Sequence, residues 1–149
     1  MYEKVLVPLD GTHEAEQVIP LIKEELSTDT EVVLLKVIPH TKTRVIGEQI
    51  ILGSQREEAD RLAALSYLKN LANQYGDAEK WDFDTITAAR PHEGIALFAQ
   101  QQSVDLIAMY EPERKGLAKF MKRSTSKAVE KSTAVELRTF GPQDVKESA

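Results

Sequence analysis

Cysteine is absent from the 149-residue sequence, which excludes disulfides, thiolate nucleophiles, iron–sulfur clusters and zinc sites built from cysteine. No apolar run approaches the roughly 18 residues that a membrane-spanning helix needs. The opening segment MYEKVLVPLD also lacks the basic, apolar and small-residue regions of a signal peptide. We therefore expect a soluble, cytoplasmic protein that does not contact a membrane.

Positive charge is in the minority, with 19 Lys and Arg against 24 Asp and Glu and a sequence pI near 5.3. This balance argues against a protein that coats nucleic acid through its overall field. The 42% of hydrophobic residues is enough to form a core, and the length suits one domain. We expect a single domain over residues 1–140 and a flexible C-terminal tail over residues 141–149.

Motifs for catalysis are also missing. The sequence has neither a G-x4-G-K-[ST] phosphate loop nor a G-x-S-x-G nucleophile turn. The adjacent carboxylates of Glu57 and Glu58 lie on a predicted helix, where such pairs more often serve solvation than acid–base chemistry. Trp81 is interpreted as an anchor beneath a loop. We therefore expect no catalytic residues, and a protein that acts by binding.

Short apolar runs alternate with longer stretches of helical period, which is typical of βα units. The runs have few polar breaks, so both faces of the strands should be covered. Five strands are predicted, at Lys4–Leu9, Glu31–Ile38, Phe83–Ala88, Val104–Met109 and Val135–Phe140.

Four helices are predicted between these strands. The first carries a stripe from Ala15 to Leu26, and Pro20 should kink this helix or loosen one of its backbone hydrogen bonds. The second begins with a capping box at Ser54 and Glu57 and ends near Gly76. Its inner face comprises Ala59, Leu62, Ala63, Leu68, Leu71 and Tyr75. The third begins at Pro91, the fourth runs from Leu117 to Val129, and the stretch from Pro39 to Gly53 is interpreted as a long connection.

This alternation predicts an α/β fold, an open parallel sheet with helices on both faces. Right-handed crossovers between parallel strands then place the ligand cleft beyond the carboxyl ends of the strands.

Several segments together resemble the universal stress protein family. They are KVLVPLDGT from Lys4, Ala15-Glu16 with Pro20, Val37-Ile38-Pro39, and Asp105 to Met109 followed by Arg114-x-Gly116-Leu117. The resemblance covers the chain from Tyr2 to about Phe140. It implies a five-stranded sheet of order 3-2-1-4-5, similar to the adenine nucleotide alpha hydrolase fold. It also implies a role in stress response and a homodimer joined through the last strand.

ATP-binding members of that family carry a G-x2-G-x9-G-[ST] loop after the fourth strand. In this chain the glycine positions fall on Tyr110, Glu113 and Arg123, and only Ser124 matches. Side chains there hinder the close approach of phosphates to backbone N–H groups. A Glu113 carboxylate about 4 Å from a phosphate would cost roughly 4 kcal/mol, a thousandfold in affinity, unless Arg114 or Arg123 neutralises it.

The resemblance preserves more of the part that holds the base and ribose. It implies contact of Asp10 with the ribose or with a metal-bound phosphate, of the Val37 backbone with adenine, and of Pro8 and Leu9 with the ligand as a cleft wall. The alternative is that Asp10-Gly11-Thr12 only turns the chain and caps the next helix. The candidate nucleotide cleft comprises Pro8, Leu9, Asp10, Thr12, Val37, Met109, Arg114, Gly116, Arg123, Ser124 and Thr125.

Two functions follow. The first is a binding or regulatory module without tight ATP binding, for which an adenine ligand with fewer phosphates stays open. The second is an ATP-binding, slowly hydrolysing member that uses Arg123, Ser124 and Thr125 in place of glycines.

Basic residues gather between Arg114 and Lys131, a segment that contains seven basic residues and one acidic residue. Lys115, Lys119 and Lys122 share one helical face and could hold an anionic ligand or an acidic partner. A plain solvated helix face is the alternative. Aromatic residues do not interleave with this basic stripe, which disfavours nucleic acid.

His13, His40 and His92 each follow the end of a predicted strand. Converging imidazoles can bind zinc, yet no H-x-H or H-x3-H pair supports such a site, and no metal is expected.

The last strand carries a detail relevant to assembly. If two Val135–Phe140 strands pair antiparallel about an axis through Leu137, Glu136 of one chain lies opposite Arg138 of the other. We therefore expect the homodimer to form through this strand.

Overall fold

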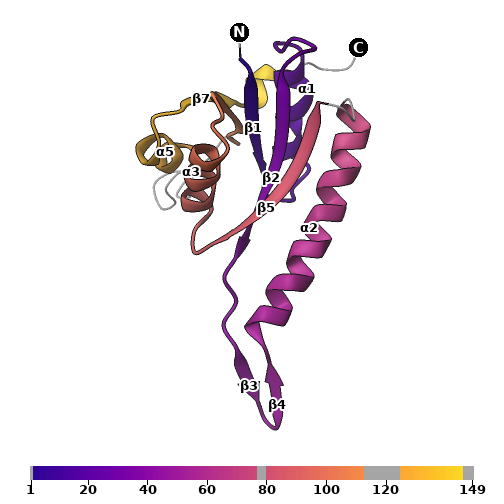
Figure 1. Ribbon diagram of the computed structural model, residues 1–149, viewed down its shortest axis with the longest axis vertical. Coiled ribbons are helices and arrows are strands. Elements are labelled where there is room, and N and C mark those ends of the chain that lie inside the picture. Colours follow the sequence, from indigo (N-terminus) through magenta and orange to yellow (C-terminus); the bar gives the residue numbers. More distant parts are fainter. Residues whose placement is uncertain (1, 77–79, 113–124, 146–149) are drawn as a thin grey trace.

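The computed structural model describes residues 2–76, 80–112 and 125–145 (Figure 1). Seven strands are described: β1 (Lys4–Leu9), β2 (Glu31–Pro39), β3 (Arg44–Ile46), β4 (Gln49–Ile51), β5 (Trp81–Ala88), β6 (Leu106–Tyr110) and β7 (Glu136–Phe140). The described α-helices are α1 (Val18–Lys23), α2 (Gly53–Tyr75), α3 (Pro91–Gln101) and α5 (Thr125–Ser132), with short 3-10 turns at Ala15–Gln17 and Pro142–Asp144.

Five of these strands form one parallel sheet in the order β5-β2-β1-β6-β7. When these five strands are numbered in the order in which they occur along the chain, the sheet order is 3-2-1-4-5, as predicted. Strand β1 lies at the centre, with Val5 paired to Val32 on one side and to Leu106 on the other. The chain reverses direction along the sheet at the gap between β1 and β6, where open α/β sheets bind ligands.

Helices cover both faces of the sheet, again as predicted (Figure 1). Successive side chains of a strand point to opposite faces, so the central strands contribute to two cores. One core joins Val5 and Val7 to α1 and to the C-terminal half of α2. The other joins Leu6 to α3 and α5. Each fully buried Leu or Val contributes about 1.5–3 kcal/mol through the hydrophobic effect.

Pro20 lies in the first turn of α1, which is preceded by the 3-10 turn Ala15–Gln17. A proline in a first turn replaces an N–H that has no helical partner, so the kink expected there is unnecessary. Val18, Ile19 and Ile22 of the predicted stripe are fully buried.

The capping box predicted for α2 is wrong. Leu52 is the N-cap residue and makes no side-chain cap. Glu57 instead accepts a hydrogen bond from the Thr41 backbone N–H at 2.7 Å and lies 3.5 Å from Nδ1 of His40. The other end was predicted correctly, since α2 ends at Tyr75 and Gly76 caps it.

Trp81 packs against Gly76 so closely that a Cβ there would lie 2.3 Å from the indole ring. The indole ring therefore anchors the junction between α2 and β5, in agreement with its interpretation as an anchor.

The connection predicted between Pro39 and Gly53 contains a hairpin, which corrects the expectation of irregular chain. Strands β3 and β4 pair antiparallel, with Val45 opposite Ile50. Gly47 has a φ of +61°, and the non-glycine residue after it has no positive φ. This is the pattern of a type II′ turn, which matches the twist of a hairpin.

The inner face predicted for α2 is half right. Leu68 and Leu71 are buried in the core, but Ala59, Leu62 and Ala63 are exposed. The reason is visible in Figure 1, where the N-terminal half of α2 extends beyond the sheet together with the hairpin.

Strand β7 forms one edge of the sheet. Its Glu136 accepts a hydrogen bond from the Tyr2 hydroxyl, and its Arg138 pairs with Glu25. After β7, the Gly141 backbone N–H donates to Asp144 Oδ2 at 2.8 Å within the turn Pro142–Asp144. Within the described residues, no helix is long and apolar enough to cross a membrane.

Candidate functional site

A cleft of about 520 Å³ opens at the carboxyl ends of β1, β2 and β6. The first turns of α3 and α5 complete it. Its lining comprises Pro8, Leu9, Asp10, Ala15, Lys36, Val37, Pro39, Pro91, Ile95, Met109, Tyr110, Glu111, Pro112, Thr125 and Ser126. The position is the one that the strand order predicts for a ligand.

The turn after β1 brings a carboxylate to this cleft. Asp10 Oδ1 accepts hydrogen bonds from the Thr12 backbone N–H at 2.9 Å and from the Thr12 hydroxyl at 2.6 Å. Thr12 Oγ1 in turn accepts from the Ala15 N–H at 3.2 Å. Gly11 between them has a φ of +90°, a conformation that side chains other than glycine rarely adopt.

The turn-and-cap interpretation of Asp10-Gly11-Thr12 is therefore realised. One oxygen of the carboxylate can still accept a hydrogen bond from a ligand, because Asp10 Oδ2 has no hydrogen bond to any residue that the structure describes.

Sequence reasoning missed Lys36, the basic residue of the cleft, and seven other lining residues: Ala15, Pro39, Pro91, Ile95, Glu111, Pro112 and Ser126. The Lys36 ammonium lies beside the Gly11 turn, 3.5 Å from where a Cβ at that position would be, and 6.0 Å from the centre of the Tyr67 ring. Among the described lining residues, Lys36 is the only cation. The sequence signal for this residue is a lysine inside the otherwise apolar strand VVLLKVIP. Burial of an unpaired lysine costs free energy, so a lysine in such a strand indicates that its ammonium faces a polar cleft.

The walls of the cleft are apolar. Pro8 and Leu9 come from β1, Met109 from β6 and Ile95 from α3. Val37 of β2 packs tightly on α3, since a Cβ at Gly94 would lie 2.9 Å from Val37 Cγ1. Such walls suit the flat, weakly polar faces of a nucleobase.

Ionisable groups around the cleft are held in defined states. Burial and a hydrogen bond of 2.6 Å to Glu16 raise the pKa of the Tyr67 hydroxyl. Burial also raises the pKa of Tyr110, with the Glu14 and Asp144 carboxylates adding to it. Both phenols therefore stay neutral near pH 7, and Tyr67 donates its hydrogen bond to Glu16.

Six of the predicted site residues line the cleft: Pro8, Leu9, Asp10, Val37, Met109 and Thr125. Thr12 does not line it but holds Asp10 in place. Tyr110, at the first glycine position of the ATP loop, is also a lining residue. Arg114, Gly116, Arg123 and Ser124 lie outside the described residues, as do Glu113 and the lysines of the basic stripe at 115, 119 and 122.

The three predicted histidines lie in different surroundings. His13 lies 3.5 Å from Glu16, and His40 lies at the same distance from Glu57. His92 is the second residue of α3. Over residues 2–76, 80–112 and 125–145, no three His, Asp or Glu side chains gather as metal ligands would.

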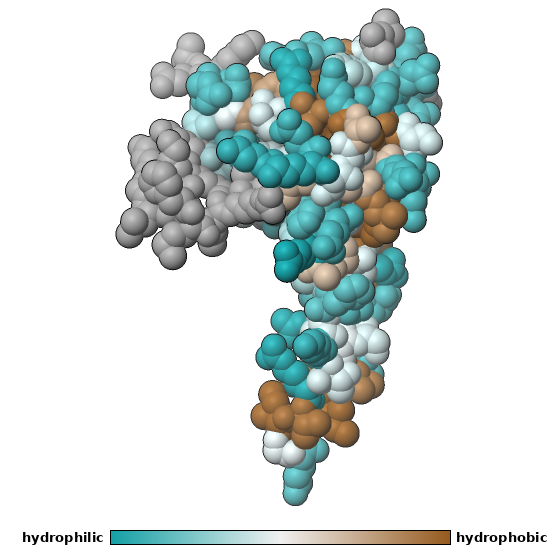
Figure 2. Space-filling model, turned by 90° about the vertical axis from the view of Figure 1, so that its left-hand side faces the viewer, coloured by the Kyte–Doolittle hydropathy of each residue, from teal (hydrophilic) through white to brown (hydrophobic). Residues whose placement is uncertain are grey.

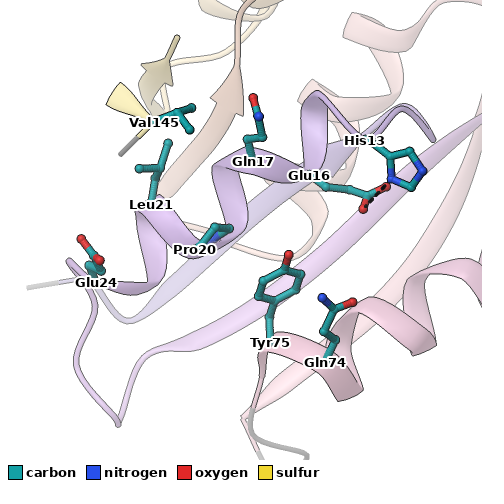
Figure 3. Close-up of a pocket in the computed structure, with 9 residues that line it drawn as sticks. All are labelled: His13, Glu16, Gln17, Pro20, Leu21, Glu24, Gln74, Tyr75 and Val145. Carbon is teal, nitrogen blue, oxygen red and sulfur yellow. Dashed lines mark ion pairs between the residues drawn. The ribbon is translucent and has the colours of Figure 1, made fainter. Parts of the chain in front are cut away.

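A second cavity of about 470 Å³ lies between α1, the end of α2 and Val145 (Figure 3). Figure 3 shows His13 and Glu16 paired at one end and Glu24 at the other, with Pro20 and Leu21 between them. Glu16 is already occupied by Tyr67 and His13. This cavity lies away from the strand ends, so the first cleft is the candidate site.

The model of the universal stress protein family matches residues 1–136. The chain belongs to this family. No curated protein matches the chain at a significant level. Among solved structures, this universal stress protein is similar to hypothetical protein MJ0577, with 21% identity, a TM-score of 0.71 and 99% of each chain covered.

Two other similar structures contain nucleotides. One is a universal stress protein in complex with cAMP, with 13% identity, a TM-score of 0.67 and coverage of 94% of this chain and 97% of that one. The other is a family member from Arabidopsis thaliana with AMP bound, with 15% identity, a TM-score of 0.60 and coverage of 93% and 91%. At sequence identities this low, the similarity to these structures supports a shared fold.

Proposed function

We propose that this universal stress protein is a binding or regulatory module for stress response that takes an adenine mononucleotide in the cleft and performs no chemistry on it. The observation that carries the proposal is the cleft at the β1–β6 switch point, with apolar walls and one cation, Lys36, among the described lining residues. A base fits the walls, and a monoanionic or dianionic phosphate suits a single lysine.

Three polar groups of the cleft receive a role. Asp10 Oδ2 accepts a hydrogen bond from a ribose hydroxyl, because Oδ1 already accepts two hydrogen bonds from Thr12. The Val37 backbone meets the adenine edge, and the Lys36 ammonium faces the phosphate. Two similar family members contain cAMP and AMP, which supports a ligand of this size.

The number of phosphates follows from the loop after β6. Tyr110 stands where ATP-binding members have a glycine, and it lines the cleft. Glu113 and Arg123 stand at the other two glycine positions of the sequence. We therefore propose weak binding of ATP. The alternative is an ATP-binding, slowly hydrolysing protein that uses Arg123, Ser124 and Thr125 instead of glycines.

Isothermal titration calorimetry tests this proposal with AMP, cAMP and ATP, each with and without Mg²⁺. We expect AMP or cAMP to bind more tightly than ATP. Lys36→Met should weaken AMP binding by roughly ten- to hundredfold, since a charge-assisted hydrogen bond contributes about 1.5–3 kcal/mol. The exposed helix lysine Lys69 supplies the matched control, and Lys69→Met should leave affinity unchanged.

Two results would count against the proposal. Micromolar binding of ATP with Mg²⁺, tighter than that of AMP, favours the alternative. Failure of all three nucleotides to bind, with none released from the purified protein in denaturing mass spectrometry, removes nucleotide binding altogether.

The homodimer through β7 also stays a proposal. Glu136 and Arg138 already have partners within the chain, Tyr2 and Glu25. Formation of the cross-chain pair between Glu136 and Arg138 therefore requires these two side chains to exchange partners. Sedimentation at micromolar concentration tests the dimer, and a monomer would contradict it.

An acidic partner or anionic ligand at Lys115, Lys119 and Lys122 is proposed from the sequence alone. Its binding should weaken steeply with salt and on Lys119→Glu. Equal binding at low and high salt would contradict it.

A further inference from the structure

The β3–β4 hairpin and the N-terminal half of α2 project from the body of the protein (Figure 1). We call residues 42–63 the arm. It starts at the carboxyl end of β2, next to Pro39 of the cleft. Figure 2 shows hydrophobic side chains gathered near the end of this projection.

The hairpin exposes apolar side chains on both of its faces, one of which also carries Arg44 and Gln49. Val45 and Ile50 are cross-strand partners and share one face, while Ile46 and Ile51 lie on the other. Their exposed fractions are 71% for Val45, 65% for Ile50, 58% for Ile46 and 41% for Ile51. A solvated hairpin would keep its apolar side chains on one covered face, so apolar side chains exposed on both faces indicate a segment that contacts a partner.

The helix of the arm continues the apolar surface. Leu62 is 56% exposed, and Ala59 and Ala63 beside it are exposed too. These residues follow the helical period of a buried face, yet no other described element of the chain covers them. Two strands of three residues each are also too short to be stable alone, so the hairpin gains from a partner.

The charges of the hairpin are arranged in a self-complementary way. Lys42 and Arg44 lie at its base and Glu48 lies in the turn at its tip. Their side chains form no ion pair or hydrogen bond with any residue that the structure describes. The charges of the adjoining helix are paired within the chain, Arg56 with Asp60 and Arg61 with Glu58.

We infer that the arm is an interface for a second copy of this chain, with two hairpins side by side and antiparallel about a two-fold axis. In that arrangement the tip of each hairpin meets the base of the other, so Glu48 of each copy faces Arg44 of its partner. Both ion pairs form at once because a two-fold contact is reciprocal. In the same register Ile46 of each copy lies on the axis, next to Ile46 of the other.

This contact is distinct from the one proposed at β7, since the arm leaves the sheet at the carboxyl end of β2 and β7 lies at the sheet edge beyond β6. Both contacts together would give a tetramer.

Reversal of single charges tests the arrangement in the full-length protein. Arg44→Glu and Glu48→Arg each place like charges at both symmetric positions and should weaken association roughly tenfold. In an equimolar mixture of the two variants, a mixed dimer pairs the introduced glutamate with the introduced arginine at one position and keeps the native pair at the other. We expect sedimentation velocity to show restored association in the mixture, and no change for the control Lys69→Glu.

The absence of cysteine allows a second measurement that leaves the charges intact. Ile46→Cys lies on the axis of the inferred contact and should form a disulfide-linked dimer on mild oxidation, whereas Asn70→Cys, exposed farther along α2, should not. The single-cysteine variants also report on the contact if a charge variant fails to fold by circular dichroism.

Three results would overturn the inference. The first is an unchanged mass in every charge variant together with the absence of an Ile46→Cys dimer. The second is weakened association that the mixture does not restore. The third is binding of the chain to vesicles of phosphatidylcholine and phosphatidylserine that is lost on joint Val45→Ser and Ile50→Ser substitution, because it would assign the arm to a lipid surface.

Discussion

The close contact between α3 and β2 gives a quantitative prediction. Gly94 lies in the first turns of α3, and a Cβ there would be 2.9 and 3.0 Å from the two methyl carbons of Val37 and 3.2 Å from Cβ of Ala88. Contacts below 3.0 Å force atoms to move. Gly94→Ala therefore pushes the helix away from the sheet at the wall of the cleft.

Two effects of opposite sign set the magnitude. Overpacking of a close contact costs about 1–3 kcal/mol. Replacement of glycine by alanine within a helix gains about 1 kcal/mol. The net expectation is a loss of about 1 kcal/mol in the free energy of unfolding, equivalent to roughly 3 °C in Tm for a domain of this size.

Urea denaturation followed by circular dichroism measures this loss. A second substitution identifies its cause, because Val37→Ala removes the methyl groups that Gly94→Ala would strike. The double variant should be more stable than the sum of the single effects predicts, by about 1 kcal/mol. Val32→Ala, which changes a valine on the opposite face of the sheet, should combine additively with Gly94→Ala.

A stabilising Gly94→Ala substitution, with no coupling to Val37→Ala, would refute this reasoning. Helix propensity alone would then govern position 94, and the α3–β2 contact would be looser than the distances indicate.

Three other predictions concern single side chains. Leu6→Ala should lower the free energy of unfolding by about 2–5 kcal/mol because Leu6 is fully buried, whereas Leu62→Ala should change it by under about 0.5 kcal/mol in urea titrations at concentrations where the chain is monomeric. Gly11→Ala should cost about 1–3 kcal/mol, since its φ of +90° is strained for alanine, and equal thermal stability would contradict the strained turn. Because burial raises the pKa of Tyr67 above its ordinary value of 10.0, the native state prefers the neutral phenol. That stabilisation is fully present below pH 10 and is lost as the pH rises further, so Tyr67→Phe should show a shallower decline in alkaline denaturation, and an identical decline would contradict the assignment.

Local patterns in the sequence were sufficient for most of the fold. Apolar runs such as Lys4–Leu9 can be buried only as central strands, and their alternation with helical stripes leaves few arrangements. Pro91 and Gly76 marked helix ends because their backbone preferences act within one turn. The strand order, in contrast, came from the resemblance to a family and not from periodicity.

The errors concern contacts between distant parts of the chain. Ser54 and Glu57 have the spacing of a capping box, but Glu57 is drawn to Thr41 and His40 instead. The hairpin has a weak signal in the sequence: Gly47-Glu48 separates two β-branched runs, but strands this short leave no sustained period. Lys36 lies in a strand whose apolar residues predict burial on both faces, and this pattern hides its exposure to the cleft.

By itself, the sequence determined the class of fold, the ends of several helices and the residue types that line the strand ends. Tertiary structure decided which of those residues meet in one cleft, because Asp10, Lys36 and Met109 come from three strands that only the sheet brings together. Tertiary structure also decided that the apolar helix face at Leu62 is exposed. Helical period shows that a face is apolar, but whether the chain covers that face itself or leaves it for a partner depends on where the helix ends relative to the sheet.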